Sequence, residues 1–478
     1  MTIIAQARLG IHDPHDCTDA SDELPILHAV YDTLVRRVGQ DYVPHLARAW
    51  DVSEDARVWT FHLVPGVTFH DGSPCDAMAV KASLERMARE DKGYTLGAPA
   101  VWRQYLGGAR IDVADVVTLK VILAEPMADL LDVLEQGFIV APSAFGALDA
   151  GDLTAQIGSG PYRLTDIGED AITATPVDGH FAGDPANDTV TWRLVPDAAE
   201  RLALLERGAV QVANGLDFEA SRRLGAMRHE FLSPVAIIYL LNAAKGPLTD
   251  PRIRRALSVA VDREALITTV MHGAAKPLRG FVSPNHYGAG DGQGAQCDRD
   301  LARALLAEAG YAEGLTLEVD CPTRLPDEAE RLTAALGAQL AEVGIRLNVH
   351  IHPEREDYAH MVRRKEIRDL CVFDSSPMST YRVLYEKIDS RIKGSWWQGY
   401  ANPEVEALID KGRVTTDRDT RAALWREVYA LMQDDPAWLT LYSPIRVIGL
   451  TGEHPEFAMP ADGVIDVARL PHLPESEA

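Results

Sequence analysis

The stretch from Val43 to Arg89 constrains the fold of this chain more than any other part of the sequence. Large apolar residues occupy alternate positions of 58–63, which is the period of a strand with one buried face. The Pro-Gly pair at 65–66 favours a turn, and the short run 67–69 predicts a returning strand. Asp76 then precedes apolar residues at three- to four-residue spacing, as an N-cap precedes an amphipathic helix. The stretch therefore predicts a β-hairpin followed by a helix.

Length and charge bound the class of protein. A chain of 478 residues exceeds one ordinary hydrophobic core, so we expect two or three domains. Acidic residues outnumber basic ones by 71 to 47, giving a formal charge of −24. Nucleic acids and anionic membranes both reward positive charge, so neither is an expected partner. No apolar run approaches 18 residues, so we expect no transmembrane helix and no direct insertion into a membrane.

Several further segments carry a recognisable pattern together with the stretch 43–89. They are His12-Asp13-Pro14, Gly158–Leu164 (GSGPYRL), Ile237–Asn242, the segment beginning Thr249-Asp250-Pro251, Tyr400–Glu406 and Trp438–Tyr442. As a set, and in this order, they resemble the solute-binding proteins of dipeptide, oligopeptide and nickel ABC importers (solute-binding protein family 5). The resemblance spans nearly the whole chain, which makes it more specific than any single motif.

The resemblance implies an α/β, two-lobe periplasmic-binding-protein fold of type II, cluster C, with a ligand cleft between the lobes. It also implies the boundaries of a first lobe at 1–43, 157–237 and 441–478, an inserted subdomain at 44–156 and a second lobe at 238–440. Within this frame we expect one continuous helix over 252–267 and a strand over 345–352. The strand is expected to turn Ile345, Leu347, Val349 and Ile351 inward.

Motifs for catalysis are missing from the sequence. It contains no Gly-x-Ser-x-Gly, His-Glu-x-x-His or Walker A pattern. Residues 290–295 match a dinucleotide fingerprint but follow no buried strand, so we interpret them as a loop. His350 and His352 share one strand face, a geometry open to two metal ligands, yet Arg346 and Asn348 on that face favour a solvated surface. We therefore expect no enzyme activity, no cofactor and no metal site.

The stretch 374–400 is the main candidate for ligand binding. Aromatic residues form 7% of the chain, but six of them fall between Phe373 and Tyr400, together with arginines. Aromatic rings provide apolar walls, and arginine clamps carboxylates with two hydrogen bonds. One tryptophan of the pair is alternatively a core residue, and Tyr381 and Tyr385 alternatively form a helix face against the core. The candidates in this stretch are Asp374, Ser376, Tyr381, Arg382, Arg391, Trp396, Trp397 and Tyr400.

Trp102 and Arg103 form a second candidate patch, either as part of a carboxylate pocket or as a packed Trp beside a surface Arg. Peptide receptors of the family offer an Asp to the ligand's amino group near the cleft aromatics. Between Lys387 and Tyr400 the only acid is Asp389, so a small carboxylated solute, an opine-like or other amino-acid conjugate, or a metal chelate is as compatible as a peptide.

The expected function is that of a periplasmic receptor that closes on a solute and presents it to an ABC permease with its ATPase subunits. We expect a monomer. The N-terminus from Met1 lacks the basic and apolar regions of an export signal, so we interpret the chain as a mature form with a replacement Met. The alternative is a cytoplasmic ligand-sensing module with the same fold. The odd number of cysteines, five, leaves at least one outside any internal disulfide.

Overall fold

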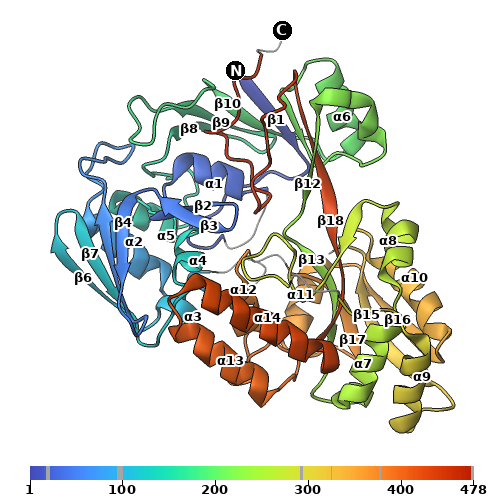
Figure 1. Cartoon of the computed structure of the whole chain (residues 1–478). Coiled ribbons are helices and arrows are strands. Elements are labelled where there is room, and N and C mark those ends of the chain that lie inside the picture. Colours follow the sequence, from blue (N-terminus) through green and yellow to red (C-terminus); the bar gives the residue numbers. More distant parts are fainter. Residues whose placement is uncertain (18–21, 94–100, 291–293, 325, 376–377, 475–478) are drawn as a thin grey trace. The chain divides into compact units, whose positions relative to one another are not determined.

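The computed structural model describes residues 1–17, 22–93, 101–290, 294–324, 326–375 and 378–474 (Figure 1). The described residues form two compact units, one from the parts 1–231 and 446 onward, the other from 232–445. Strand β18 (Trp438–Leu450) begins in the second unit and ends in the first. The predicted boundaries of the inserted subdomain, 44–156, stay a prediction.

The larger sheet of the first unit is built around β1 (Thr2–Gln6). This strand pairs in parallel with β10 on one side and β11 on the other. The sheet continues antiparallel from β10 through β9 to β8, while β11 pairs with the end of β18. Its other strands are β8 (Tyr162–Ile167), β9 (Ala171–Pro176), β10 (Val190–Leu194) and β11 (Val212–Asn214). Strand β8 directly follows the Gly-rich motif at 158–161, and β10 has alternating buried positions at Val190 and Trp192.

A separate antiparallel sheet in this unit has the order β4-β5-β7-β6. Its strands are β4 (Ala47–Val52), β5 (Val58–Leu63), β6 (Arg110–Asp115) and β7 (Thr118–Ile122). Helix α2 (Ala77–Met87) packs on β6 and β7, and the Asp76 carboxylate accepts hydrogen bonds from the N–H groups of Met78 and Ala79, as an N-cap does. The predicted strand and capped helix are confirmed, with Trp59, Phe61 and Leu63 buried.

The predicted hairpin within 58–69 is wrong. Residues 67–69 form no strand beside β5, and Thr68 makes only an isolated bridge to Pro74. Both edges of β5 are occupied by strands from elsewhere, β4 on one side and β7 on the other. The turn at Gly66, with a φ of +78°, therefore leads away from the sheet.

The first unit contains further short elements. They are the paired strands β2 (Val35–Val38) and β3 (Asp41–Pro44), the helices α1 (Leu24–Val30), α3 (Arg103–Leu106), α4 (Leu131–Leu134), α5 (Phe145–Asp149) and α6 (Ala198–Glu206), and the 3-10 helices η2 (Pro142–Ala144) and η3 (Ala220–Met227). Helix α6 has Asp197 as its N-cap, and the Asp197 carboxylate accepts a hydrogen bond from the Glu200 N–H. Strand β12 (Arg228–Leu232) pairs with β18.

The second unit holds a sheet in the order β16-β15-β17-β13-β18. Strand β15 pairs in parallel with both β16 and β17, and β13 runs antiparallel to β17 and β18. Every residue of β13 is buried, as expected for an apolar central strand. The strands are β13 (Ala236–Leu241), β14 (Ala275–Pro277), which pairs with β18, β15 (Leu315–Pro322), β16 (Ile345–His352) and β17 (Leu370–Ser375).

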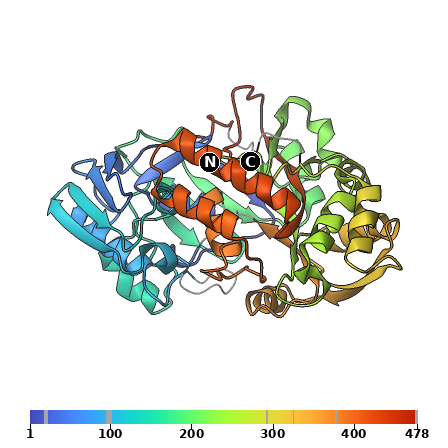
Figure 2. The same ribbon diagram turned by 60° about the horizontal axis from the view of Figure 1, so that its bottom comes forward.

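The helices of the second unit include α13 and α14, which lie side by side (Figures 1 and 2). The full set is η4 (Pro247–Thr249), α7 (Pro251–Ala260), α8 (Arg263–Met271), α9 (Arg299–Glu308), α10 (Ala329–Ala341), α11 (Arg355–Arg363), α12 (Thr380–Lys387), α13 (Pro403–Val414) and α14 (Arg418–Asp434). Asp298 is the N-cap of α9, and its carboxylate accepts a hydrogen bond from the Leu301 N–H.

Two predictions for this unit are wrong. The helix expected over 252–267 is two helices, because Val261 is extended and the Asp262 carboxylate accepts from the Ala265 N–H to cap α8. In β16, Val349 and Ile351 are 41% and 48% exposed. The core cluster of the unit reaches only the first half of this strand, at Ile345 and Leu347.

Candidate functional site

The stretch 374–400 spans the end of β17, helix α12 and the turns before α13. Ser379 begins the helix, because its Oγ accepts a hydrogen bond from the Arg382 N–H at 3.0 Å. Ser376 lies outside the described residues. The stretch thus presents a short helix followed by a loop that carries the tryptophan pair.

Helix α12 is unusual because it buries its charged residues. Arg382 is 2% exposed, and its Nε lies 3.2 Å from a carboxylate oxygen of Glu386. The Lys387 Nζ donates to Ser375 Oγ at 2.8 Å. Tyr381 is also buried, with its ring centroid 5.6 Å from that of Tyr385. Burying a charged side chain costs free energy unless the charge is paired, so these contacts offset the cost of burying Arg382 and Lys387.

The two tryptophans occupy different environments. Trp396 is buried and packs on Phe373, with ring centroids 4.8 Å apart. Trp397 is half-buried, and its Nε1 donates to the Tyr400 carbonyl at 2.6 Å. The Lys393 ammonium lies 5.7 Å from the centre of the Trp397 ring, within reach of a cation–π contact. Of the pair, Trp397 is the better placed to present surface to a ligand.

Arg391 and Tyr400 already have partners within the second unit. The Arg391 guanidinium lies 2.7 Å from Asp389 Oδ2 and 2.6 Å from Asp410 Oδ2. Hydrogen bonds from these two carboxylates raise the pKa of Arg391 above its ordinary value. Tyr400 is buried, with the Arg254 guanidinium 5.8 Å from its ring centre. Asp374 is half-buried at the end of β17. The ligand-binding roles of all these residues stay predictions.

The second predicted patch lies at the start of α3 in the first unit. Trp102 is fully buried. Arg103 is half exposed, and its Nη2 lies 2.9 Å from Glu90 Oε1. Arg103 also lines a small surface depression with Leu84 and Leu106. Its role as a carboxylate clamp stays a prediction.

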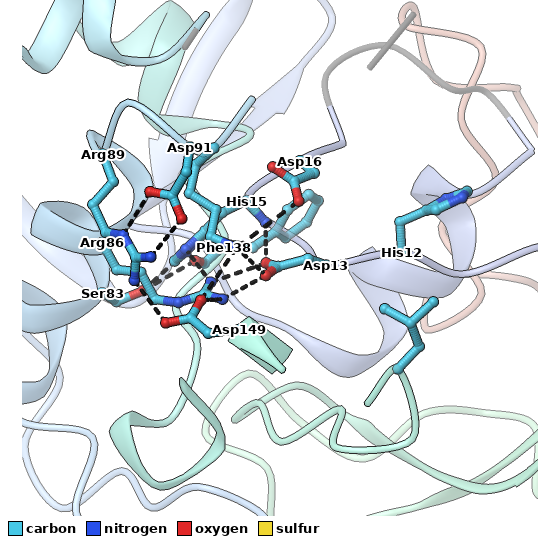
Figure 3. Close-up of polar contacts among 12 residues, drawn as sticks. His12, Asp13, His15, Asp16, Ser83, Arg86, Arg89, Asp91, Phe138 and Asp149 are labelled. Atoms are coloured by element: carbon cyan, nitrogen blue, oxygen red, sulfur yellow. Dashed lines mark hydrogen bonds and ion pairs between the residues drawn. The ribbon is translucent and has the colours of Figure 1, made fainter. Parts of the chain in front are cut away.

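A buried polar cluster in the first unit was not predicted from the sequence. It comprises the buried residues Asp13, His15, Arg86 and Lys92 together with the exposed Asp149; all of these except Lys92 are labelled in Figure 3. Asp13 Oδ1 accepts from Arg86 Nη1 at 2.9 Å, and Asp13 Oδ2 accepts from Lys92 Nζ at 2.8 Å. Arg86 Nη2 also donates to Asp149 Oδ1 at 2.7 Å. The cluster therefore ties the N-terminal segment to α2 and α5.

The charges in the cluster set one another's protonation. Burial would raise the pKa of Asp13, but hydrogen bonds from Arg86 and Lys92 hold it well below its ordinary range. Burial, and then the charge of Arg86, lower the pKa of His15 to about 4. His15 Nε2 lies 3.0 Å from the Phe138 carbonyl, and its Nδ1 lies 2.9 Å from Arg86 Nη1. Both contacts favour a neutral ring with the proton on Nε2.

The sequence motifs at 43–89 and 158–164 contact each other in the first unit. The His70 N–H donates to the Gly158 carbonyl at 2.8 Å, and His70 Nε2 lies 2.9 Å from the Gly160 carbonyl. A Cβ on Gly158 would lie 2.1 Å from the Val30 carbonyl oxygen, so this close approach requires glycine. The motifs at 12–14, 43–89 and 158–164 thus meet in a structural network. Their spacing in the chain gave no sign of this contact.

The histidines of β16 contact carboxylates of the neighbouring strand. His350 Nε2 lies 2.5 Å from Glu318 Oε2, and His352 Nε2 lies 2.8 Å from Asp320 Oδ1. Among the residues that the structure describes, no group of three or more His, Cys, Asp or Glu side chains is arranged to hold a metal ion. In the same described parts, no helix is both long and apolar enough to span a membrane.

Comparison with solved structures identifies the fold. The chain superposes on NikA from Brucella suis, in complex with Fe(III)-EDTA, with a TM-score of 0.82 at 23% identity, covering 98% of this chain and 99% of that one. For the periplasmic binding protein DppA from Helicobacter pylori, in complex with peptide STSA, the TM-score is 0.79 at 22% identity, covering 98% and 96%. The predicted α/β fold of cluster C periplasmic binding proteins is therefore confirmed.

Sequence relatives agree with the fold. The chain is 26% identical over 457 residues to the dipeptide-binding protein of Escherichia coli K12, covering 87% of this chain and 85% of the relative. It is 30% identical over 415 residues to the glutathione-binding protein GsiB of Shigella dysenteriae serotype 1, covering 83% and 79%. Residues 41–381 match the middle region of a family of binding proteins rather than enzymes. The chain belongs to the bacterial extracellular solute-binding proteins, family 5.

Proposed function

We propose that this chain is the periplasmic receptor of an ABC importer, which captures a small carboxylated solute and delivers it to the permease. The observation that carries the proposal is the family match over residues 41–381. It favours a transport receptor over a cytoplasmic sensor. A monomer suffices for this role, and the permease with its ATPase subunits is the partner.

Three known solute types define the range of candidates. Relatives are named for binding dipeptides and glutathione, and one structural neighbour, AgaA of A. tumefaciens R10, holds agropinic acid. Each of these solutes carries a carboxylate. In the loop after α12 the only acid, Asp389, is bound by Arg391, with its Oδ1 2.9 Å from Arg391 Nε. This pairing leaves the loop poor in groups for an amino terminus and supports recognition through the solute's carboxylate.

We propose that binding shifts a population from an open to a closed form. The solute favours the closed form to the extent that it makes more contacts in that form than in the open one. Closure would also exclude water, and Arg–carboxylate attraction strengthens as the local dielectric falls. Trp397 would supply an apolar wall to the solute.

Mass spectrometry tests the proposal directly. Native spectra of the purified protein are compared with spectra taken under denaturing conditions, and a mass excess lost on denaturation identifies a captured solute by fragmentation. A thermal-shift panel of dipeptides, glutathione, opines and Fe(III)-EDTA follows. Stabilisation by one carboxylated solute supports the proposal, because a ligand at 100 times its Kd stabilises by about 2.7 kcal/mol. A protein that carries no solute and responds to no panel member contradicts it.

A further inference from the structure

The loop that carries the tryptophan pair is attached to the end of helix α11. The Lys365 Nζ donates to the carbonyl of Gly394 and to that of Ser395, each at 2.6 Å. One turn further along the loop, Gln398 Nε2 donates to the Val362 carbonyl at 2.7 Å. Trp397 therefore sits between two attachments to the same helix end.

Lys365 adopts a backbone conformation that lysine rarely takes. Its φ is +64°, in the left-handed region that normally favours glycine at the position after a helix. Its N–H donates to the Val362 carbonyl at 3.1 Å, which closes the last turn of α11. Glycine would make this turn without strain, so the lysine side chain needs a separate reason, and the two carbonyls of the tryptophan loop provide one.

The environment of the amine fits a fixed contact rather than a mobile surface lysine. Burial, and then the charge of Arg363, lower the pKa of Lys365 to about 8. The residue is thus only partly exposed to water, yet its amine is still mostly protonated at neutral pH. Charge-assisted hydrogen bonds to two carbonyls are stronger than neutral ones, and they fix the backbone immediately before Trp396.

We infer that Lys365 is the positioning residue of the ligand-binding loop, which holds the backbone of 394–395 so that the Trp397 ring keeps one orientation toward the solute. The inference rests on the proposed function. It assigns to Lys365 no contact with the solute itself. An increase in loop freedom would cost affinity, because binding would have to order the loop.

The test uses the full chain labelled with 5-fluorotryptophan and ¹⁹F NMR, which needs no ligand. Trp397→Phe assigns the Trp397 resonance among those of the eight tryptophans. In Lys365→Met and in Lys365→Gly this resonance is expected to shift and broaden, while Lys365→Arg restores a single sharp line. Glycine is the decisive variant, because it removes the whole side chain with its amine while relieving the strained φ, so a broadened line in this variant cannot come from backbone strain.

Lys411→Met is the matched control, since Lys411 is an exposed lysine on α13. An unchanged Trp397 line in both Lys365→Met and Lys365→Gly would overturn the inference and would show that Lys365 serves only the helix end. Failure of the proposed function would appear differently, as a protein that carries no solute and responds to no member of the thermal-shift panel, and it would leave the NMR result standing.

Discussion

Replacing Asp13 with Asn tests how much of the first unit's stability depends on the buried cluster. Each oxygen of this carboxylate faces two donors: Oδ1 accepts from Arg86 Nη1 and the His15 N–H, and Oδ2 from Arg86 Nη2 and Lys92 Nζ. An amide of the same shape must point its own N–H groups at one of these pairs. The substitution therefore replaces attraction by repulsion whichever way the amide turns.

The magnitude follows from burial. The side chains of Asp13, Arg86 and Lys92 are only 5%, 2% and 6% exposed. Removing one partner of a buried ion pair costs about 3–5 kcal/mol. Asp149 remains beside both cations, which places the expected loss at the lower end, about 3 kcal/mol. For domains of roughly 150–250 residues this corresponds to a fall in Tm of about 6–12 °C.

Asp91→Asn provides the control, because Asp91 lies 2.5 Å from Arg89 Nη2 but is 57% exposed. Exposed pairs contribute about 0–1 kcal/mol, so its Tm should hardly move. Differential scanning calorimetry and urea unfolding at pH 7 measure both variants. The reasoning is refuted when Asp13→Asn loses no more stability than Asp91→Asn.

The pH dependence checks the same cluster. The folded pKa of Asp13 is depressed, so its contribution is present above the unfolded value, about 4, and is lost as pH falls toward the folded value. The stability gap between the wild type and Asp13→Asn should therefore be constant from pH 7 to about 5. Below that range the gap should narrow. A gap that widens on acidification would contradict the assignment of Asp13 as the buried anion.

Other predictions address separate contacts. Gly158→Ala should lose about 1–3 kcal/mol by overpacking against the Val30 backbone, whereas Gly146→Ala, which has open space in α5, should not destabilise in urea unfolding. Arg254→Met should lower the free energy of unfolding by about 3 kcal/mol, because the buried guanidinium pairs with Asp435 and donates hydrogen bonds to backbone carbonyls. Arg255→Met, at a more exposed ion pair, should lower it by less than about 1 kcal/mol. Equal losses in urea unfolding would argue against the buried network. Lowering the pH from about 6.5 to 4 should reduce the free energy of unfolding, because in this range the unfolded state protonates His15 and the folded state does not. In His15→Gln the slope of the unfolding free energy against pH should be shallower by about one proton. Trp397→Ala or Arg103→Ala should weaken solute binding at least tenfold by calorimetry without lowering Tm, with Trp50→Ala as the control, and unchanged affinity in both would exclude the predicted pocket.

Local patterns predicted local structure well. The predicted N-cap Asp76 is confirmed, because an N-cap depends only on the residues that follow it within one turn. The alternation in 58–63 predicted a strand but not its neighbours, since β4 and β7 are chosen by packing across the whole sheet. Asp262 was read as part of one long helix, although an aspartate inside an apolar period is also a cap signal.

The candidate site shows the same limit more strongly. The enrichment in aromatic residues selected the stretch 374–400 as a candidate. The spacing of the aromatic residues could not distinguish buried Trp396 from half-buried Trp397. Nor could it show that Arg391 is held by Asp389 and Asp410, because that contact joins a loop to α13. The Asp13 cluster was missed for a related reason. Its members are polar residues far apart in the chain, from Asp13 to Asp149, and no local hydrophobic period marks them as partners.

Strand β18 has a consequence for how the chain acquires its structure. It pairs with β13 and β14 of the second unit and with β11 of the first, yet it lies within the last tenth of the sequence, at Trp438–Leu450. A nascent chain therefore holds two unfinished sheets, with open edges at β11 and β13, until β18 has been synthesised. Such edges are templates for wrong pairing. The late strand therefore delays completion of both units together.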